Sequence, residues 1–363
     1  MSARPTSVPA SDHFRIAVPK IMVSNSSRRT HVQFNPVDEI ETGAPFRPPH
    51  FINRFVWFLI LSVVFLAALP ALAYAQSPPL QSEEQVVRGP DAGDGLGSAV
   101  AVDGNTAVIG VPGDDALNSD IEDSGAVYVY ERTASGSWTE TQVLRLASPQ
   151  PNIFFGSAVA LAEDVLLVGA PDDNGVGNDA GAVFVFEPDQ SGTWSQMDVL
   201  RGSNTNANDN FGAAVAFDGR AAVIGAPGRG GIDDNLFAAG AAYTFRRATD
   251  GTWTEEAVLG ASNAGVRDEF AVSVGIDEGV VVVGAQKEDG TNDNTSRSGA
   301  AYVFERTGGS WTETTLLRAP DAEKGDEFGI AVSIHGPRIA VGAHFTTGEN
   351  GAANAGTAYL FDH

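Results

Sequence analysis

Aspartate and asparagine are concentrated in short, glycine-containing segments, and these are the residues best suited to bind a ligand. The most compact group lies in DDNGVGNDA at 172–180 and comprises Asp172, Asp173, Asn174, Asn178 and Asp179. Carboxylate and amide oxygens are the ligands that Ca²⁺ prefers. The same residue types dominate ordinary solvated turns, because they tolerate left-handed backbone and bond their own main chain. A calcium site and a plain turn are therefore competing interpretations of this loop.

Comparable acidic loops recur along the chain, and we expect them to bind a partner. The residues concerned are Asp114, Asp115, Asp120, Asp233, Asp234, Asp289 and Asp293. A face lined by such loops would attract cations or a basic partner and would repel nucleic acid phosphates. The competing interpretation is that the acidic face only keeps the protein soluble.

The elements that carry these loops repeat with a period of 56 to 59 residues. One marker is a glycine that ends an apolar run, at Gly110, Gly169, Gly225, Gly284 and Gly342. A tryptophan follows the first four glycines, at Trp138, Trp194, Trp253 and Trp311. Each unit reads as four short strands with alternating side chains. Such a period predicts radially stacked sheets, so the fold class is all-β, a five-bladed β-propeller of four-stranded blades.

The last unit lacks a fourth strand of its own. EEQVVRGPDA at 83–92 matches TTLLRAPDA at 314–322. We therefore expect the N-terminal strand, Glu84 through Arg88, to complete the last blade and close the ring. A closed ring leaves no long exposed strand edge.

Two motifs in these units resemble the FG-GAP repeat of integrin α-chain propellers and of many bacterial surface proteins. Phe155-Gly156 precedes Gly169-Ala170-Pro171, and Phe211-Gly212 precedes Gly225-Ala226-Pro227. The resemblance spans about 280 residues, and it implies extracellular recognition or adhesion, often with calcium. Integrin propellers have seven blades, whereas this chain has five units.

The calcium site of that family has no counterpart here. Calcium-binding members carry a D-x-D-x-D-G loop between FG and GAP, where this chain has two-residue turns such as Asp103-Gly104. Two residues cannot surround an ion with six or more oxygens. If calcium is a cofactor, we expect it at the separate acidic loops between the second and third strands, of which 172–180 is the most compact.

An enzyme is the alternative function. Five-bladed propellers that resemble arabinanase-type glycosidases place carboxylates around a central channel, and the candidates here would be Asp94, Asp209, Asp268 and Asp326. Their recurrence from unit to unit argues against catalysis, since active sites need unlike groups in unlike surroundings. No G-x-S-x-G, H-E-x-x-H or phosphate-binding loop occurs in the sequence. We expect a non-enzymatic binding protein, with a glycan-active hydrolase as the alternative.

The segment before the repeats predicts export. Arg54 precedes an apolar run at 55–75 that ends in Ala73-Tyr74-Ala75. A positive flank, an apolar core and a small-x-small triplet are typical of a cleaved signal peptide; an uncleaved membrane anchor is the other interpretation. The predicted domains are a disordered extension or misassigned start at 1–54, a signal peptide at 55–75, a linker at 76–82 and a propeller at 83–363.

Composition agrees with a secreted, periplasmic or surface location. The chain has 22 Lys and Arg against 46 Asp and Glu, a net charge of −24, and no cysteine. Only Lys287 and Lys324 remain among the lysines after residue 75. High acidity with little lysine fits a protein facing salt water, where ions screen self-repulsion. We expect a monomer that binds an extracellular protein or glycan, and no nucleic acid.

Overall fold

The computed structural model describes residues 20–26, 29–35, 85–89, 91–115, 121–290, 295–348 and 351–363. The chain divides into two compact units, Met1–Ser82 and Glu83–His363. The described residues contain no helix long and apolar enough to cross a membrane. The predicted signal peptide at 55–75 and the linker at 76–82 lie outside these residues.

The first unit contains a β-hairpin in the stretch where no fold was expected. β1 (Lys20–Ser26) pairs antiparallel with β2 (Arg29–Asn35), with Val23 opposite Val32. β1 contains Ile21 and Val23 and β2 contains Thr30 and Val32, β-branched residues that favour extended backbone. An isolated two-stranded hairpin is only marginally stable in water.

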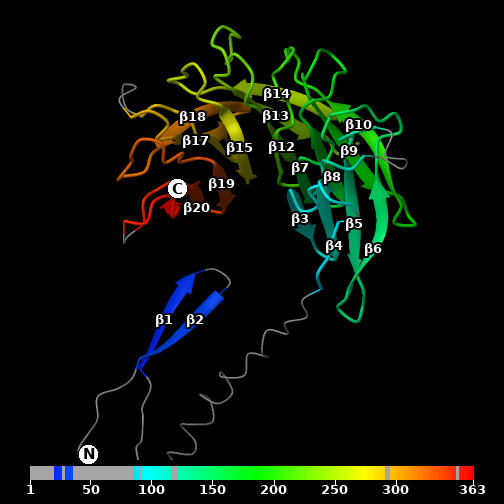
Figure 1. Ribbon diagram of the computed structural model, residues 1–363, viewed down its shortest axis with the longest axis horizontal. Coiled ribbons are helices and arrows are strands. Elements are labelled where there is room, and N and C mark those ends of the chain that lie inside the picture. Colours follow the sequence, from blue (N-terminus) through cyan, green and yellow to red (C-terminus); the bar gives the residue numbers. More distant parts are fainter. Residues whose placement is uncertain are drawn as a thin grey trace, which may run out of the picture. The chain divides into compact units, whose positions relative to one another are not determined.

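The second unit is a five-bladed β-propeller, the predicted fold class (Figure 1). Blade 1 comprises β3 (Ala99–Asp103), β4 (Thr106–Val111), β5 (Ala126–Arg132) and β6 (Trp138–Leu144). Blade 2 comprises β7 (Ala158–Ala162), β8 (Val165–Ala170), β9 (Ala182–Pro188) and β10 (Trp194–Leu200). Blade 3 comprises β11 (Ala214–Phe217), β12 (Ala221–Ala226), β13 (Ala241–Arg247) and β14 (Trp253–Leu259). Blade 4 comprises β15 (Phe270–Asp277), β16 (Val280–Ala285), β17 (Ala300–Thr307) and β18 (Ser310–Leu317). Blade 5 comprises β19 (Ala331–His335), β20 (Arg338–Ala343) and β21 (Thr357–Asp362).

All pairings within a blade are antiparallel, and the core lies between blades. The second and third strands are buried on both faces, as in β8 and β12, where every residue is buried. A continuous apolar strand of this kind needs a sheet packed on each side. One cluster, for example, joins Val108 and Val129 of blade 1 to Leu166 and Phe186 of blade 2. Blades therefore stabilise one another in sequence order.

Each of the four junctions between successive blades repeats one set of contacts, which we name the seam. In the seam of blades 2 and 3, backbone N–H groups of Asn208, Asn210 and Phe211 donate to carbonyls of residues 178–180, at 2.8, 3.1 and 3.0 Å. Phe211 is fully buried and meets Tyr243 edge to face, with ring centroids 5.2 Å apart. The phenylalanines at the other three seams, Phe155, Phe270 and Phe328, are buried in the same way.

The seam also explains the glycine that ends the second strand. A Cβ on Gly225 would collide with the backbone carbonyl of Ala271 in the next blade. The same collision exists at Gly110, Gly169 and Gly284, each against a carbonyl of the following blade. Glycine is required here because the neighbouring backbone occupies the space of a side chain.

The predicted closure by the N-terminal strand is not formed. Blade 5 has three strands, and residues 85–89 make no strand within the described chain. The side-chain amide of Gln85 instead bonds the backbone of Trp138, accepting from its N–H at 2.8 Å. Residues 85–89 do not pair with β21 because the Gln85 contact keeps them beside blade 1, whereas blade 5 lies at the other end of the row of blades (Figure 1).

Candidate functional site: the loop face

One face of the propeller carries the loops between second and third strands together with the loops that cross to the next blade. The seam hydrogen bonds join these two sets of loops, since the crossing loop donates and the preceding blade's loop accepts. We name this surface the loop face. Its backbone contains many left-handed residues, such as Asp179 at φ 54° and Asn208 at φ 66°. The predicted site residues that the structure describes all lie here.

The residues predicted to bind calcium are already engaged within the protein. Asp173 is buried, and its carboxylate accepts from Arg201 Nη2 at 2.6 Å. Asp172 accepts from Asn210 Nδ2 at 2.7 Å, and Asn174 Oδ1 accepts from the Asp179 N–H at 3.0 Å. The carbonyl of Asn178 takes part in the seam. Burial, together with the charge of Asp179, raises the pKa of Asp172, which disfavours its ionised form.

These placements do not fit a calcium ion. No group of three or more His, Cys, Asp or Glu side chains in the described ranges is arranged to hold a metal. The oxygens of the 172–180 loop face different protein donors, whereas calcium needs six or more converging on one point. Calcium binding stays a prediction from sequence, and no step below depends on it.

The aspartates predicted to bind a partner divide into buried and exposed positions. Asp114 is buried and forms a two-pronged pair with Arg145, at 2.8 and 2.6 Å. Asp115 accepts from the Asp123 N–H at 3.0 Å, and Asp289 from the Arg297 N–H at 2.8 Å. The remaining described positions are the exposed residues Asp233 and Asp234. Asp120 and Asp293 lie outside the described residues.

The buried member of each acidic loop has a structural partner that also repeats. Arg145, Arg201 and Arg318, each just after a fourth strand, pair with Asp114, Asp173 and Glu288 of the same blade. A buried carboxylate paired in this way is costly to uncover, because it would be left charged and unpartnered. These acids therefore fasten the loops rather than offering charge to a ligand.

The repeated carboxylates at the start of blades 3, 4 and 5 have a turn-capping role. Asp209 accepts from the Asn206 N–H at 2.8 Å, and Asp326 from the Glu323 N–H at 2.7 Å. Asp268 makes the same bond to Gly265 at 2.7 Å. Burial raises the pKa of Asp94 and of Asp209. Equivalent acids with one shared role are what the recurrence predicted.

A second part of the loop face was not predicted from sequence. Ile232 and Phe237 of the blade 3 loop are 50% and 67% exposed. Val266, which precedes Arg267 on the loop that crosses to blade 4, is 59% exposed. The guanidinium of Arg267 lies over the Phe237 ring, 5.6 Å from the ring centroid. The backbone N–H of Arg267 donates to the backbone carbonyl of Phe237 at 2.9 Å. Arg267 pairs with no carboxylate among the described residues. We name these four residues the loop patch.

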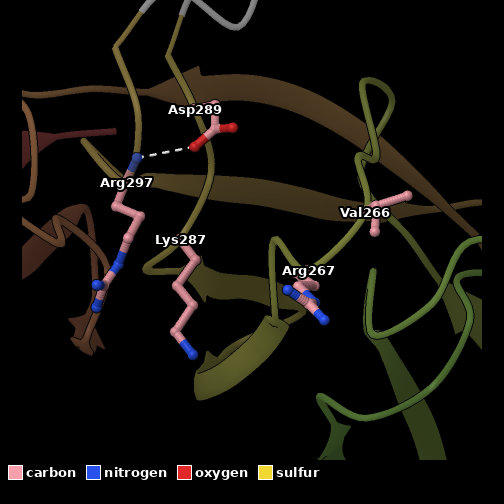
Figure 2. Close-up of a pocket in the computed structure, with 5 residues that line it drawn as sticks. All are labelled: Val266, Arg267, Lys287, Asp289 and Arg297. Carbon is pink, nitrogen blue, oxygen red and sulfur yellow. Dashed lines mark hydrogen bonds between the residues drawn. The ribbon is translucent and has the colours of Figure 1, made fainter.

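Next to the loop patch lies a shallow hollow of about 350 Å³ with cationic walls. Val266, Arg267, Lys287, Asp289 and Arg297 line it (Figure 2). The long side chains of Lys287 and Arg297 run roughly parallel, and Asp289 is set back from their charged ends (Figure 2). Lys287 pairs with Glu269 at 2.6 Å, and Arg297 pairs with Glu327. The hollow therefore interrupts the expected uniform negative charge of this face.

Two sequence signals could have indicated this region. The acidic loop of blade 3 contains Ile232 and Phe237, which are large apolar residues in an otherwise polar turn. Lys287 is one of only two lysines after residue 75. Neither signal reveals exposure, because an apolar loop residue can equally be buried under a neighbouring blade. The proximity of the two loops depends on the seam between blades 3 and 4.

Comparison with known proteins gives one clear result. The sequence pattern described as FG-GAP repeat matches five times, at residues 89–130, 138–186, 194–245, 253–304 and 311–361. No curated protein matches the chain. The five matches cover more than half of the sequence and follow the blades, with each complete repeat running from a Trp-bearing outer strand to the third strand of the next blade. The chain belongs to the FG-GAP repeat family.

Proposed function

We propose that this propeller is a non-enzymatic binding module that holds a protein partner at the loop patch. The observation that carries the proposal is the exposed Phe237 ring beneath the guanidinium of Arg267, an arginine without a carboxylate partner in the described structure. Ile232 and Val266 are further exposed apolar residues on the same two loops. Large exposed apolar groups beside arginine are typical of the energetically dominant part of protein interfaces. Scattered single apolar residues would need no such explanation.

The adjoining hollow gives the partner a chemical signature. Arg267, the basic residue of the hollow without a carboxylate partner in the described structure, presents positive charge beside an apolar surface in a molecule whose net charge is −24. An acidic side chain of the partner would be drawn to this spot and repelled elsewhere, which favours one orientation of binding. The expected partner is therefore an extracellular protein with an apolar contact surface and a nearby carboxylate. Export by the 55–75 segment and action at the cell surface belong to the same proposal.

The test is a binding screen followed by matched variants. Immobilised protein is screened against extracellular proteins and against glycans, and each hit is measured with Phe237→Ala and Arg267→Ala. Because both side chains are exposed, the variants should fold normally. We expect at least a 10-fold rise in Kd for each, about 1.4 kcal/mol. Met197→Ala, on the outer strand of blade 2 and 62% exposed, is the matched control and should bind like the wild type.

Two results would reject the proposal. One is a protein ligand whose Kd is the same for both loop-patch variants and the control. The other is a screen that returns only glycans, particularly with turnover of the glycan, since that outcome would favour the hydrolase alternative.

A further inference from the structure

The two ends of the blade array carry opposite halves of a seam. Blade 1 begins with Gly93, Gly95 and Leu96. The residues at the equivalent positions of the other four blades donate the backbone N–H bonds of the seams. Blade 5 ends with the loop before Gly356. In blades 1–4, the backbone carbonyls of the residues just before the equivalent glycine accept the seam hydrogen bonds. Four bridges link successive blades through Gly125, Gly181, Gly240 and Gly299, and none within the described residues involves Gly356.

The glycines of blade 5 show that its half of the seam is vacant in the described structure. A Cβ on Gly342 would find Ala331 of its own blade as its nearest neighbour, at 3.6 Å, whereas its four counterparts would collide with the next blade. A Cβ on Gly356 would come no closer than 3.4 Å, to His344 of its own blade. The left-handed φ of 76° at Gly356 by itself favours glycine. Gly342 has no such backbone requirement, so it leaves a space that only a following blade would need.

Apolar side chains are exposed on both ends. Leu360 of β21 is 82% exposed, although its counterparts Val129, Val185 and Val303 in the other blades are at most 1% exposed. On β3 at the other end, Val100 and Val102 are 68% and 65% exposed. Large apolar side chains gain stability when they are removed from water, so a surface that covers these positions is favoured.

Residues 85–89 add an independent observation. The Gln85 amide contacts both backbone groups of Trp138, just as the Gln142 amide contacts both of Trp194 one blade later. Gln142 lies on β6, the outer strand of a preceding blade. The segment at Gln85 therefore occupies the place of an outer strand beside blade 1, without the other three strands of that sheet. Blade 5 offers three strands without an outer one.

We propose that these ends bind each other between two copies of the chain. Blade 5 of one copy docks against blade 1 of the next, and residues 85–89 of the second copy pair with β21 of the first. Within the described residues, blade 5 pairs neither with blade 1 nor with residues 85–89 of its own chain. A second copy is an occupant that supplies both missing halves. This replaces the expectation of a monomer.

The contact is head to tail, because the two surfaces that meet are different. A contact of this type closes into a ring if the rotation between copies permits and otherwise extends into a filament. The loop patch lies on blades 3 and 4, away from both ends, so assembly leaves it accessible. Each added copy would multiply the number of loop patches in one particle, which raises avidity for a repeated or surface-bound partner.

Mass measurement of the full chain over a range of concentrations tests the proposal. We expect the wild type to exceed the 37.8 kDa of one chain, with the excess growing with concentration. Leu360→Glu and Val100→Glu place a charge at exposed positions of the two ends, so each should fold and remain a single chain. Gly342→Ala, which has room in the free blade but not in a seam, should raise the dissociation constant at least 10-fold. Met197→Glu is the control and should assemble normally.

Mixing distinguishes head-to-tail contact from other modes. Leu360→Glu retains an intact blade 1 end, and Val100→Glu retains an intact blade 5 end. Neither variant should associate alone, but an equimolar mixture should form a complex of two chains and no larger one. Self-association of either variant alone, or a mixture that stays single, overturns the proposal.

Crosslinking separates contact between copies from closure within one chain. The chain has no cysteine, so Leu96→Cys and Ala355→Cys can be combined in one variant and joined with a short bismaleimide. These positions are equivalent to Phe155 and Ser124, which meet in an existing seam. Products of two or more chains support the proposal. Crosslinked single chains only, or a wild type of one-chain mass at every concentration, overturn it.

Discussion

Individual side chains connect neighbouring blades, and Glu256 is the clearest example. Its carboxylate accepts from Arg246 of its own blade at 2.8 Å and from Arg306 of blade 4 at 2.8 and 3.1 Å. Burial alone would raise the pKa of Glu256, but the hydrogen bonds and charges of the two arginines together lower it below 4.5. Ionised Glu256 is therefore favoured by folding, because both arginines lie near it only in the folded protein.

The contribution of Glu256 to stability should depend on pH. A carboxyl group whose pKa is lower in the folded than in the unfolded protein stabilises the fold above its unfolded pKa. That contribution is lost as pH falls through the folded pKa. Glu256→Gln should therefore lower the free energy of unfolding by about 1.5–3 kcal/mol at pH 7. The difference from wild type should shrink as pH falls below 4.5. Urea unfolding at pH 7, 5, 4 and 3 measures both, and a gap that stays constant with pH contradicts the assignment.

At the scale of elements, one glycine position distinguishes the four formed seams from the free end. The second strands of all blades end alike in sequence, yet Gly225 is pressed against the next blade and Gly342 is not. The consequence of adding a methyl group should therefore depend on whether a blade follows. Neither residue has a left-handed φ, so the contact and not the backbone conformation decides the outcome.

The second stability prediction uses this matched pair. Gly225→Ala should cost more than about 3 kcal/mol, because a backbone carbonyl must move or a seam must open. Gly342→Ala should change the unfolding free energy by less than about 1 kcal/mol, since only ordinary van der Waals neighbours surround the new Cβ. Both are measured at low protein concentration, where association does not contribute. Equal destabilisation by the two substitutions would disprove the distinction.

For the whole molecule, charge is the dominant global property. The 22 basic residues cannot neutralise 46 acidic ones, and the basic side chains that form ion pairs leave an excess of 24 negative charges. Self-repulsion of this size opposes the compact state and is weakened by salt, whose screening length falls from about 10 Å at 0.1 M to about 3 Å at 1 M. Partly buried pairs such as Arg145 with Asp114 are screened less.

A salt titration tests that balance. Raising NaCl from 0.05 to 1 M should raise the Tm by several degrees, because relief of repulsion outweighs the weakening of exposed ion pairs. The measurement is thermal unfolding at neutral pH, with an uncharged solute such as sucrose at equal osmolality as the reference. A Tm that falls with NaCl would show that attractive pairs dominate instead.

The repeat determined what could be predicted. Features that recur in most units, such as the buried seam phenylalanines and the capping role of Asp209, Asp268 and Asp326, follow from periodicity because equivalent residues face equivalent neighbours. Features that occur once do not. The loop patch depends on which apolar loop residues are left exposed by neighbouring blades. Whether residues 85–89 reach blade 5 depends on how far each seam rotates one blade relative to the next. The match between 83–92 and 314–322 indicated a segment that lies against the outer strand of a blade, as Gln85 does at Trp138, but residues 85–89 form no strand and do not pair with blade 5.

A chain of blades joined in series also has a mechanical character. Blade 5 is held by one seam, whereas blades 2, 3 and 4 are each held by two, and no disulfide spans any junction. Tension applied at the carboxyl terminus should therefore unfold or detach blade 5 first, at the lowest force. Blades 3 and 4, whose loops carry Phe237 and Arg267, should stay folded at that force. Loss of blade 5 under load would therefore leave the region proposed to bind a partner folded.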